Sequence, residues 1–473
     1  MLLERYYDDT LAQASYLIGC EQTREAIIID PNRDAHAYVV AAAARRMRIR
    51  YVTETHIHAD FLSGSRELAR EARAKLLLSG HGGADWSYGY AADANAQLLR
   101  DGDTLMVGKV RLHVWHTPGH TPEHLAFLIT DTAIGDRPMG MVTGDFLFVG
   151  DVGRPDLLEK AAKIAGSMET AARQLFQSLR RLSSLPDYLQ IWPGHGAGSA
   201  CGKALGAVPQ STLGYERLYN PALQHATEEA FVAWVLADQP EPPPYFAEMK
   251  RRNRDGDLEW RGGDGNSWMT AKDLESAIAD KVQVIDVRSA TDFARNHLPG
   301  TINIPESKSF TTYAGTVLRY DRPIVMMVKS PDQALRIRRQ LAMIGMDLVG
   351  WSSVELMNEL KHHVRPLPLI EAGALSERIA ANGSVALRVI DVRGRSEWNH
   401  GHLPKATHIY LGDLAADLVE LNRDEPIVVH CQTGTRSSIA ASLLTARGFT
   451  NVTNFAGGVD AWQKAGLPLI DDA

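Results

Sequence analysis

Cysteine is scarce in this sequence: three residues, Cys20, Cys201 and Cys431, occur in a chain of 473. They lie far apart and no two form a Cys-x-x-Cys pair, which excludes both a disulfide framework and a zinc site built from thiolates. We therefore expect any cysteine that matters to act as a single thiol.

An excess of basic residues is also missing. The chain has 50 Lys and Arg against 57 Asp and Glu, a net charge of −7 at pH 7, which does not attract a phosphate backbone or an anionic membrane. It contains no apolar run of about eighteen residues, and MLLERYYDD at its start has acids where a secretory signal has positive charge. We expect no nucleic-acid or membrane partner, and the cytoplasm as compartment.

What is present is an ordinary globular composition in a chain long enough for roughly two to four domains. From residue 1 to about 235, short runs such as EAIIID and MGMVTGDFLF alternate with alanine-rich helical stretches, which predicts an α/β fold. From Gln239 the sequence becomes proline-rich, then charged and glycine-rich, a composition that cannot sustain a regular element. We assign residues 1–245 to a first domain and 246–265 to a linker.

An internal repeat follows the linker. VIDVRSATDFARNHLP from Val284 and VIDVRGRSEWNHGHLP from Val389 share VIDVR and HLP at the same spacing. Repetition of this kind predicts two copies of one fold, each a mostly parallel sheet with helices on both faces. We assign residues 266–363 to the first copy and 366–473 to the second.

Histidines and acids recur at the predicted strand ends of the first domain. Imidazole and carboxylate are the ligands that suit divalent iron or zinc, and glycine or proline beside most of them lets the backbone turn sharply enough to aim them at one point. The residues are His56, His58 and Asp60 in THIHAD, His120 in PGHT, Asp145 in TGDF and His195 in PGHG.

The ordered pattern THIHAD, PGHT, TGD and PGHG resembles the metallo-β-lactamase superfamily over residues 1 to about 245. The resemblance implies an αββα sandwich with its metal site at one edge. Two-metal hydrolases of that superfamily usually have HxHxDH, and the last of these histidines is Phe61 here. Because a phenyl ring has no lone pair to donate, the second position keeps only Asp60, Asp145 and His195, and we expect one metal per chain.

The remaining ligands, His56 and His120 with Asp145, have the composition of a facial triad, which leaves open positions for substrate and O2 on non-haem Fe(II). The persulfide dioxygenases of this superfamily use the same triad, and GDVGRPDL at 150–157 resembles their next loop. By that resemblance, Arg154 and Asp156 shape the substrate pocket.

Other polar residues are expected around the ion rather than on it. We expect His58, Asp60 and His195 beside the ligands, with His58 a ligand in two-metal relatives but adjacent in one-iron relatives. Asp30 in IIIDP either orients the site or caps the turn before Pro31.

Cys201 lies in a segment from Gly198 that resembles persulfide dioxygenases fused to sulfurtransferase domains. It either stands near the thiol substrate or is a small buried hydrophobe. Strand position or exposure accounts for three further histidines, to which we assign no role: His113, His116 and His124.

HCQTGTRSSIAASLL places Cys431 between a predicted strand and a helix. Gly434 permits tight curvature, and inward N–H groups, the positive end of the helix and the Arg436 guanidinium would all favour a thiolate or its persulfide anion. With VIDVR and GHLP before it, this loop resembles the rhodanese family over residues 366–473. A phosphatase is the other chemistry for a loop with a cysteine and an arginine, but related phosphatases have a loop one residue longer, so the length favours sulfur transfer. The other loop side chains expected to contact substrate are Gln432, Thr433 and Thr435.

The first copy lacks the nucleophile. Alignment puts Val328 where Cys431 stands, Pro331 at Gly434 and Gln333 at Arg436. Without a thiol this copy cannot carry sulfur covalently, and we interpret residues 266–363 as a pseudo-rhodanese that spaces or orients its neighbours.

The full pattern resembles a persulfide dioxygenase fused to two rhodanese modules. It implies that Fe(II) and O2 oxidise a persulfide of glutathione, coenzyme A or another small thiol to sulfite, and that Cys431 then forms thiosulfate, in sulfide detoxification. Two alternatives stay open: a zinc thioester hydrolase of the glyoxalase II type with an appended rhodanese, and a non-catalytic sulfur-relay or persulfide-sensing protein. The sequence leaves homo-oligomerisation open.

Overall fold

The computed structural model describes residues 1–160, 166–203, 205–256, 268–381, 387–416 and 421–471. These form two compact units: Met1–Trp260 with Met343–Gly345, and Arg261–Ala342 with Met346–Ala473. Every helix among the described residues is too short or too polar to cross a membrane.

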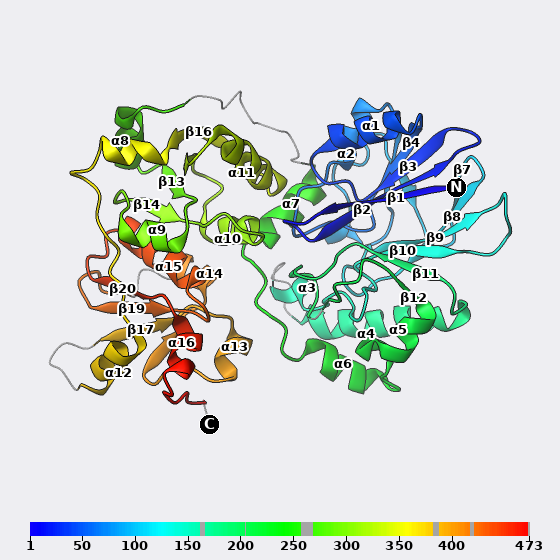
Figure 1. The fold of residues 1–473 in the computed structure, drawn as a ribbon. Helices are drawn as coiled ribbons and strands as arrows, with labels where there is room; N and C mark the ends of the chain where they lie inside the picture. Colours follow the sequence, from blue (N-terminus) through cyan, green and yellow to red (C-terminus); the bar gives the residue numbers. More distant parts are fainter. Residues whose placement is uncertain (161–165, 204, 257–267, 382–386, 417–420, 472–473) are drawn as a thin grey trace. The chain divides into compact units, whose positions relative to one another are not determined.

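The first unit contains two six-stranded sheets (Figure 1). The first sheet runs in chain order through β1 (Leu2–Asp8), β2 (Gln13–Cys20), β3 (Glu25–Ile29), β4 (Arg48–Thr53), β5 (Lys75–Ser79) and β6 (Gln97–Leu99). The second has the order β12 (Ser211–Thr212), β11 (Gln190–Pro193), β10 (Gly140–Gly144), β9 (Leu125–Asp131), β8 (Val110–His116) and β7 (Thr104–Val107).

Helices flank both sheets of this unit, with α1 and α2 beside the first and α4, α5 and α6 beside the second (Figure 1). Their bounds are α1 (Ala35–Ala44), α2 (Ser65–Glu71), α3 (Leu157–Lys160), α4 (Ser167–Arg180), α5 (Leu213–Tyr219), α6 (Glu228–Leu236) and α7 (Phe246–Asp255).

Two apolar layers explain this stacking. One joins the facing sides of the two sheets and includes Ile18, Ile27 and Phe127. The other covers the outer face of the second sheet, where Leu175 of α4 and Phe231 of α6 pack. Because a sheet buried on both faces needs such a layer on each side, the unit is the helix-sheet-sheet-helix sandwich that the sequence predicted.

The predicted linker is wrong over its first half. Phe246–Asp255 form α7, on which Phe246, Met249 and Asn253 are buried. Asn253 donates hydrogen bonds of 2.7 Å to the carbonyls of His58 and Phe61, so a buried amide makes this charged segment part of the first unit. Residues 257–265, the part of the linker after Gly256, lie outside the described residues.

The second unit contains two four-stranded sheets whose paired strands are all parallel. Their orders are β14 (Thr301–Asn303), β13 (Gln283–Asp286), β15 (Ile324–Val328), β16 (Leu348–Ser353), and β18 (Ala406–His408), β17 (Arg388–Asp391), β19 (Ile427–His430), β20 (Val452–Phe455). The two sheets therefore share one topology, second strand, first, third, fourth, which confirms the internal repeat.

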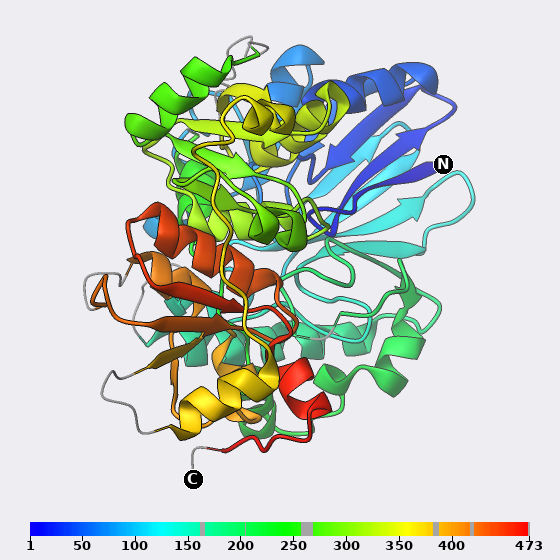
Figure 2. The ribbon, with the colours of Figure 1, turned by 60° about the vertical axis from the view of Figure 1, so that its left-hand side comes forward.

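The helices of this unit alternate with its strands. They are α8 (Ala271–Ala279), α9 (Ala290–Arg295), α10 (Phe310–Val317), α11 (Pro331–Met343), α12 (Ala372–Ala380), α13 (Arg395–Asn399), α14 (Leu411–Ala416), α15 (Thr435–Ala446) and α16 (Gly458–Lys464). In the last sheet the strands lie between α12, yellow, and α15, orange-red (Figure 2).

Candidate metal centre and thiol loop

Three buried side chains meet where strands of the first unit end. His56 follows β4, His120 lies between β8 and β9, and Asp145 follows β10 directly. Their candidate ligand atoms all lie within 4.8 Å of one another. Asp145 Oδ2 is 3.5 Å from His120 Nε2 and 3.9 Å from His56 Nε2, so two imidazole nitrogens and a carboxylate oxygen face one point.

This cluster fits a metal ion. Asp145 Oδ2 is buried and has no hydrogen-bond partner among the described residues, a state that costs free energy unless a cation satisfies the oxygen. Burial and the neighbouring imidazoles hold the pKa of His56 well below its usual range, and burial lowers the pKa of His120. Both rings are therefore neutral, which is the ligating form.

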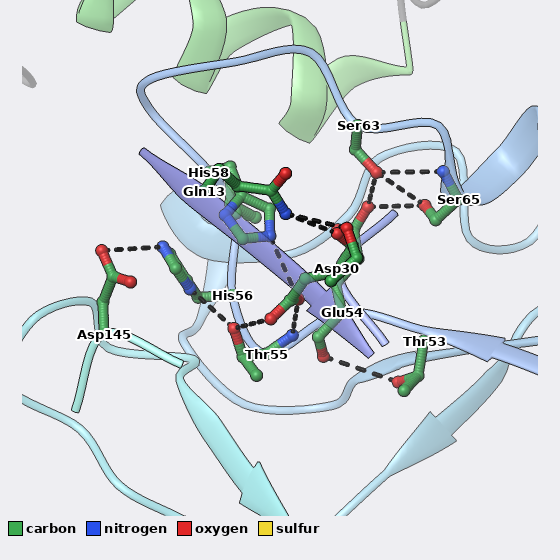
Figure 3. Close-up of polar contacts among 12 residues, drawn as sticks. Gln13, Asp30, Thr53, Glu54, Thr55, His56, His58, Ser63, Ser65 and Asp145 are labelled. Carbon is green, nitrogen blue, oxygen red and sulfur yellow. Dashed lines mark hydrogen bonds and ion pairs between the residues drawn. The ribbon is translucent and has the colours of Figure 1, made fainter. Parts of the chain in front are cut away.

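Neighbouring groups fix which nitrogen of each ring is free. The Thr55 hydroxyl donates to Asp30 Oδ2 at 2.9 Å, so it accepts from His56 Nδ1, also at 2.9 Å. His120 Nδ1 lies 3.2 Å from the carbonyl oxygen of Arg154. Both Nδ1 atoms thus carry the proton and both Nε2 lone pairs face Asp145. Figure 3 shows the chain from Asp30 through Thr55 to His56.

Asp30 also contacts His58, in addition to orienting Thr55. Its backbone is left-handed (φ 54°), an uncommon conformation for a residue other than glycine, and Oδ1 accepts from Thr55 N at 2.6 Å and from His58 Nε2 at 3.1 Å. Although burial opposes the charged ring, Asp30 raises the pKa of His58 to about 9. The imidazolium of His58 is thus held by Asp30 beside the His56 ring, whose centroid is 4.2 Å away.

Phe61 packs on the side of His58 with ring centroids 4.4 Å apart, and it is fully buried. This position accounts for the aromatic residue at the end of the polar loop THIHADF. The ring fills apolar space next to a charged imidazole and offers no ligand.

His195 bridges two carboxylates. Its Nδ1 lies 2.7 Å from Asp145 Oδ1 and its Nε2 2.7 Å from Asp60 Oδ2. Burial opposes protonation, but these carboxylates raise the pKa of His195 well above its ordinary value.

Candidate ligand atoms of Asp60, His195 and Cys201 also lie within 4.8 Å of one another, and burial raises the pKa of the Cys201 thiol. The structure therefore brings Cys201 next to the predicted centre.

Buried carboxylates hold the loop that carries His56 and His58. Glu54 Oε1 accepts from the hydroxyls of Ser63 and Ser65, the latter at 2.5 Å (Figure 3). Glu123 Oε1 accepts from Ile57 N at 2.7 Å. Neither glutamate has a motif signal, because a buried acid that accepts hydrogen bonds from distant residues looks like any other charged residue in the sequence.

His124 does have a structural task, contrary to our expectation. Its Nε2 accepts from the backbone N–H of Asp145 at 3.1 Å, and its Nδ1 lies 2.8 Å from the Thr117 hydroxyl. The ring is fully buried and places the backbone of a predicted ligand.

Arg154 and Asp156 form a buried two-point ion pair, at 3.0 and 2.8 Å. Arg154 also donates to the carbonyls of Ala200 and Pro240, at 3.1 and 2.5 Å. The pair thus ties the 150–157 loop to two later segments, one of which carries Cys201. Its role in shaping a substrate pocket stays a prediction.

Cys431 in the second unit lies between β19 and α15 and is buried. Gly434 donates its backbone N–H to Cys431 Sγ at 3.1 Å. Its φ is 115°, and a Cβ there would lie 1.9 Å from the Ala456 carbonyl oxygen, so the curvature requires glycine. Ser437 Oγ lies 3.7 Å from the sulfur and donates to the Gly434 carbonyl.

Arg436 is paired with a carboxylate that the sequence did not reveal. Its two terminal nitrogens lie 2.5 and 2.7 Å from the oxygens of Glu397 on α13. Tyr313 of α10 in the first repeat lies within electrostatic range of Arg436: burial raises the pKa of Tyr313, and the Arg436 charge opposes that rise. The first repeat, called the silent repeat from here on because it lacks the nucleophile, thus contributes a phenol to the surroundings of the Cys431 thiol.

The other predicted loop residues differ in their positions. Gln432 accepts from Arg393 at 3.0 Å and donates to Asp460 at 2.6 Å, so its side chain holds the loop. Thr433 is exposed and Thr435 is half-buried at the start of α15. Substrate contacts of these three residues stay predictions.

The two repeats can be compared at corresponding positions. Asp391 pairs with Arg393 at 2.8 Å, and Asp286 pairs with Arg288 at 2.6 Å. At the thiol position, however, Val328 ends β15 as a buried apolar residue. The scaffold is therefore preserved in the first repeat where the nucleophile is absent.

Comparison with known proteins accounts for both units. Residues 8–195 match the family model for the Metallo-beta-lactamase superfamily, and residues 270–355 and 371–465 match the Rhodanese-like domain. The crystal structure of a metallo-beta-lactamase from Staphylococcus aureus subsp. aureus COL is 40% identical with a TM-score of 0.67, covering 75% of this chain and 99% of that one. The chain belongs to the metallo-beta-lactamase superfamily. Two rhodanese-like domains follow its metallo-beta-lactamase domain.

Curated relatives of this metallo-beta-lactamase superfamily member match about half of its length. A probable metallo-hydrolase of Burkholderia pseudomallei (strain 1710b) is 27% identical over 263 residues, 50% of this chain and 86% of that protein. Persulfide dioxygenase ETHE1, mitochondrial, of Homo sapiens is 28% identical over 236 residues, 48% of this chain and 78% of that protein. The predicted family and fold are thereby confirmed.

Proposed function

We propose that this protein oxidises small-molecule thiol persulfides with Fe(II) and O2 and passes sulfur to the resulting sulfite through Cys431, in sulfide detoxification in the cytoplasm. The observation that carries the proposal is the cluster of His56, His120 and Asp145, with Phe61 in place of a further ligand. The relatives named persulfide dioxygenase support it.

His56, His120 and Asp145 would hold one ferrous ion. When bound, that ion supplies the redox chemistry that lets O2 oxidise a persulfide sulfur. In the net reaction a thiol persulfide, O2 and water give the free thiol, sulfite and two protons.

The chain's own residues set the geometry for this reaction. Thr55 holds the Nδ1 proton of His56, and the Arg154 carbonyl holds that of His120, so both rings present the same nitrogen. Cys201 is buried beside Asp60 and His195. We place the persulfide against this thiol, which burial keeps protonated and uncharged.

Sulfur transfer at Cys431 has two steps. The Cys431 thiolate attacks the outer sulfur of a persulfide, the S–S bond of the donor breaks, and the donor leaves as thiolate. Sulfite then attacks the outer sulfur of the Cys431 persulfide to form thiosulfate and return the thiolate. The Gly434 N–H, 3.1 Å from Sγ, and the positive end of α15 stabilise the anion in both steps.

The test uses the full chain, loaded anaerobically with Fe(II) and supplied with glutathione persulfide or coenzyme A persulfide. We expect one O2 consumed per sulfite formed, and thiosulfate as product while persulfide remains. Cys431→Ser should accumulate sulfite at an unchanged rate of oxygen uptake, whereas Cys20→Ser, which alters a buried thiol in the first unit, should behave as the native chain.

Two results would contradict the proposal. Zinc-loaded protein that hydrolyses glutathione thioesters while the iron form ignores O2 would make it a thioester hydrolase. Iron-loaded protein that binds persulfide without consuming O2 would make it a sulfur-relay or sensing protein.

A further inference from the structure

A cavity of about 630 Å³ in the second unit is lined by both rhodanese repeats. Five of its lining residues are cationic: Lys281, Arg319, Arg322, Arg423 and Arg447. Lys281, Arg319 and Arg322 come from the first repeat, and Arg423 and Arg447 from the second. None belongs to a motif of the chain, and no step of the proposed function uses them.

The positive charge in this cavity is largely uncompensated. Arg319 pairs with Asp321 at 2.7 Å, but within the described ranges no ion pair joins Lys281, Arg322 or Arg423 to a carboxylate. Burial and the charges of Arg319 and Arg322 lower the pKa of Arg447. Like charges held together repel one another, so the cavity favours an anion that is multiply charged.

The backbone that carries these cations is held in place. Gln283 donates to the carbonyls of Arg319 and Arg322, at 2.9 and 3.3 Å, and accepts from Arg319 N at 2.7 Å. Arg447 donates to the carbonyl of Ala415 at 2.9 Å. Rigid donors lose less conformational entropy when a ligand binds.

Part of the cavity wall is apolar. Val282, Ile302 and Leu443 line it, and Ile302 and Leu443 are buried beneath the surface. A volume of this size, apolar walls and several convergent polar groups are typical of sites for small organic molecules. A ligand that uses all of them has two or more phosphates and a flat apolar group.

The cavity is separate from the thiol loop. Cys431 precedes the first turn of α15, whereas Arg447 follows its last residue. Twelve helical residues at about 1.5 Å each put roughly 18 Å between the two ends of that helix. A ligand in the cavity would therefore occupy the opposite end of the helix that supports the nucleophile.

We infer that this cavity binds a small molecule of the nucleoside diphosphate class, with the guanidinium groups on the phosphates and the apolar wall against the base. Planar guanidinium groups match phosphate oxygens at two points, which lysine or a lone backbone N–H cannot do. The site lies at a contact between the two repeats, and it gives the silent repeat a ligand of its own.

The test measures binding of ADP to the full chain by isothermal titration calorimetry in magnesium-free buffer. We expect one ADP per chain, weaker binding as salt increases, and no binding of adenosine. Arg322→Ala with Arg423→Ala should weaken ADP binding by about tenfold or more. Lys308→Ala with Lys361→Ala removes the same charge from exposed positions outside the cavity and should leave it unchanged.

Further titrations test which ligand binds and where it binds. Inorganic pyrophosphate that binds as tightly as ADP would overturn the assignment of the apolar wall to a base. No ADP binding, or equal binding by the Arg322 and Arg423 double variant with an unchanged melting temperature, would overturn the site itself. Cys431→Ser should bind ADP like the native chain, and loss of binding there would place the ligand at the thiol loop instead.

Discussion

Ser438 on α15 donates a hydrogen bond of 2.8 Å to the side-chain oxygen of Asn303, the last residue of β14. Asn303 N in turn donates to Ser442 Oγ at 2.9 Å, and the side-chain amide reaches the carbonyls of Asp286 and Arg288, each at 3.0 Å. The helix that begins at the thiol loop is thus joined to the silent repeat by a buried amide whose oxygen and amino group are both used.

Replacing this amide should destabilise the second unit. Asn303→Ala leaves the Ser438 hydroxyl and the Arg288 carbonyl without their partner and removes one of the two donors to the Asp286 carbonyl, which keeps Ile304 N, at a cost of about 3 kcal/mol. Calorimetry should show a lower melting temperature for the transition of this unit. Asn358→Ala, at an exposed position, serves as the control, and an equal shift in both variants would contradict the role given to Asn303.

Thr55 is expected to set metal affinity although it does not face the ion. Thr55→Val removes the hydroxyl between Asp30 and His56 Nδ1 and should lower the affinity for Fe(II) or Zn²⁺ by about 10- to 100-fold. Competition with a chromophoric chelator measures this. The matched control is Thr53→Val on β4, whose hydroxyl, among the described residues, hydrogen-bonds only the Glu54 carbonyl, at 3.5 Å. Unchanged affinity in Thr55→Val would contradict the orienting role.

Phe61 is expected to limit the number of metals. Phe61→His introduces an imidazole next to Asp60 in the chain and beside the His58 ring, and it should raise the zinc content from one toward two ions per chain. Elemental analysis after gel filtration measures the ratio, with Phe61→Leu as an apolar control that should stay at one. Two ions in the native chain would refute the idea.

Glu123 should make the stability of the metal-free protein depend on pH. Burial raises its pKa from 4.5 to about 7, so the unfolded chain releases this proton at lower pH than the folded chain does. Stability is therefore lost as pH rises from about 4.5 to 7, by about 3 kcal/mol, and is level above that.

Glu123→Gln removes the titration and can keep the acceptor for Ile57 N. Urea unfolding of the first unit at pH 5 and pH 8 should show a smaller difference in this variant than in the native chain. Glu229→Gln, an exposed acid, should retain the native difference, and a native-like difference in Glu123→Gln would count against the assignment.

Glu397 should restrain the thiol. Its carboxylate neutralises Arg436, so Glu397→Gln leaves more positive potential at Cys431 and should raise the rate of thiol alkylation at neutral pH by about threefold. That rate is measured in a chain carrying Cys20→Ser and Cys201→Ser, so that Cys431 is the one thiol that reacts. Arg436→Gln should shift the rate the opposite way; shifts of the same sign in both variants would contradict the argument.

Much of the fold followed from local pattern. The repeated VIDVR strands were predicted because short apolar runs bounded by turns indicate strands, and the same spacing in both copies indicates the same topology in both. The linker prediction was wrong where α7 forms, because Asn253 bonds a loop far away in the chain and Phe246 and Met249 are buried, neither of which composition reveals.

The candidate sites divide in the same way. Motif chemistry marked His56, His120, Asp145 and Cys431, because each is of a residue type that suits a metal or sulfur site and lies in a loop after a predicted strand. The roles of His124, Glu397 and Tyr313 came from residues that the chain brings together over long separations.

The sequence by itself determined which chemical groups the chain offers: candidate metal ligands of the histidine and carboxylate type, a thiol at Cys431, a phenyl ring at Phe61 and an apolar side chain at Val328. Only the tertiary structure decided which nitrogen of each histidine is free, which acid neutralises Arg436, and that cations from two repeats share one cavity. The reason is physical: a side chain's type is local, whereas its proton, its partner and its electrostatic surroundings depend on groups that only folding places within a few ångströms.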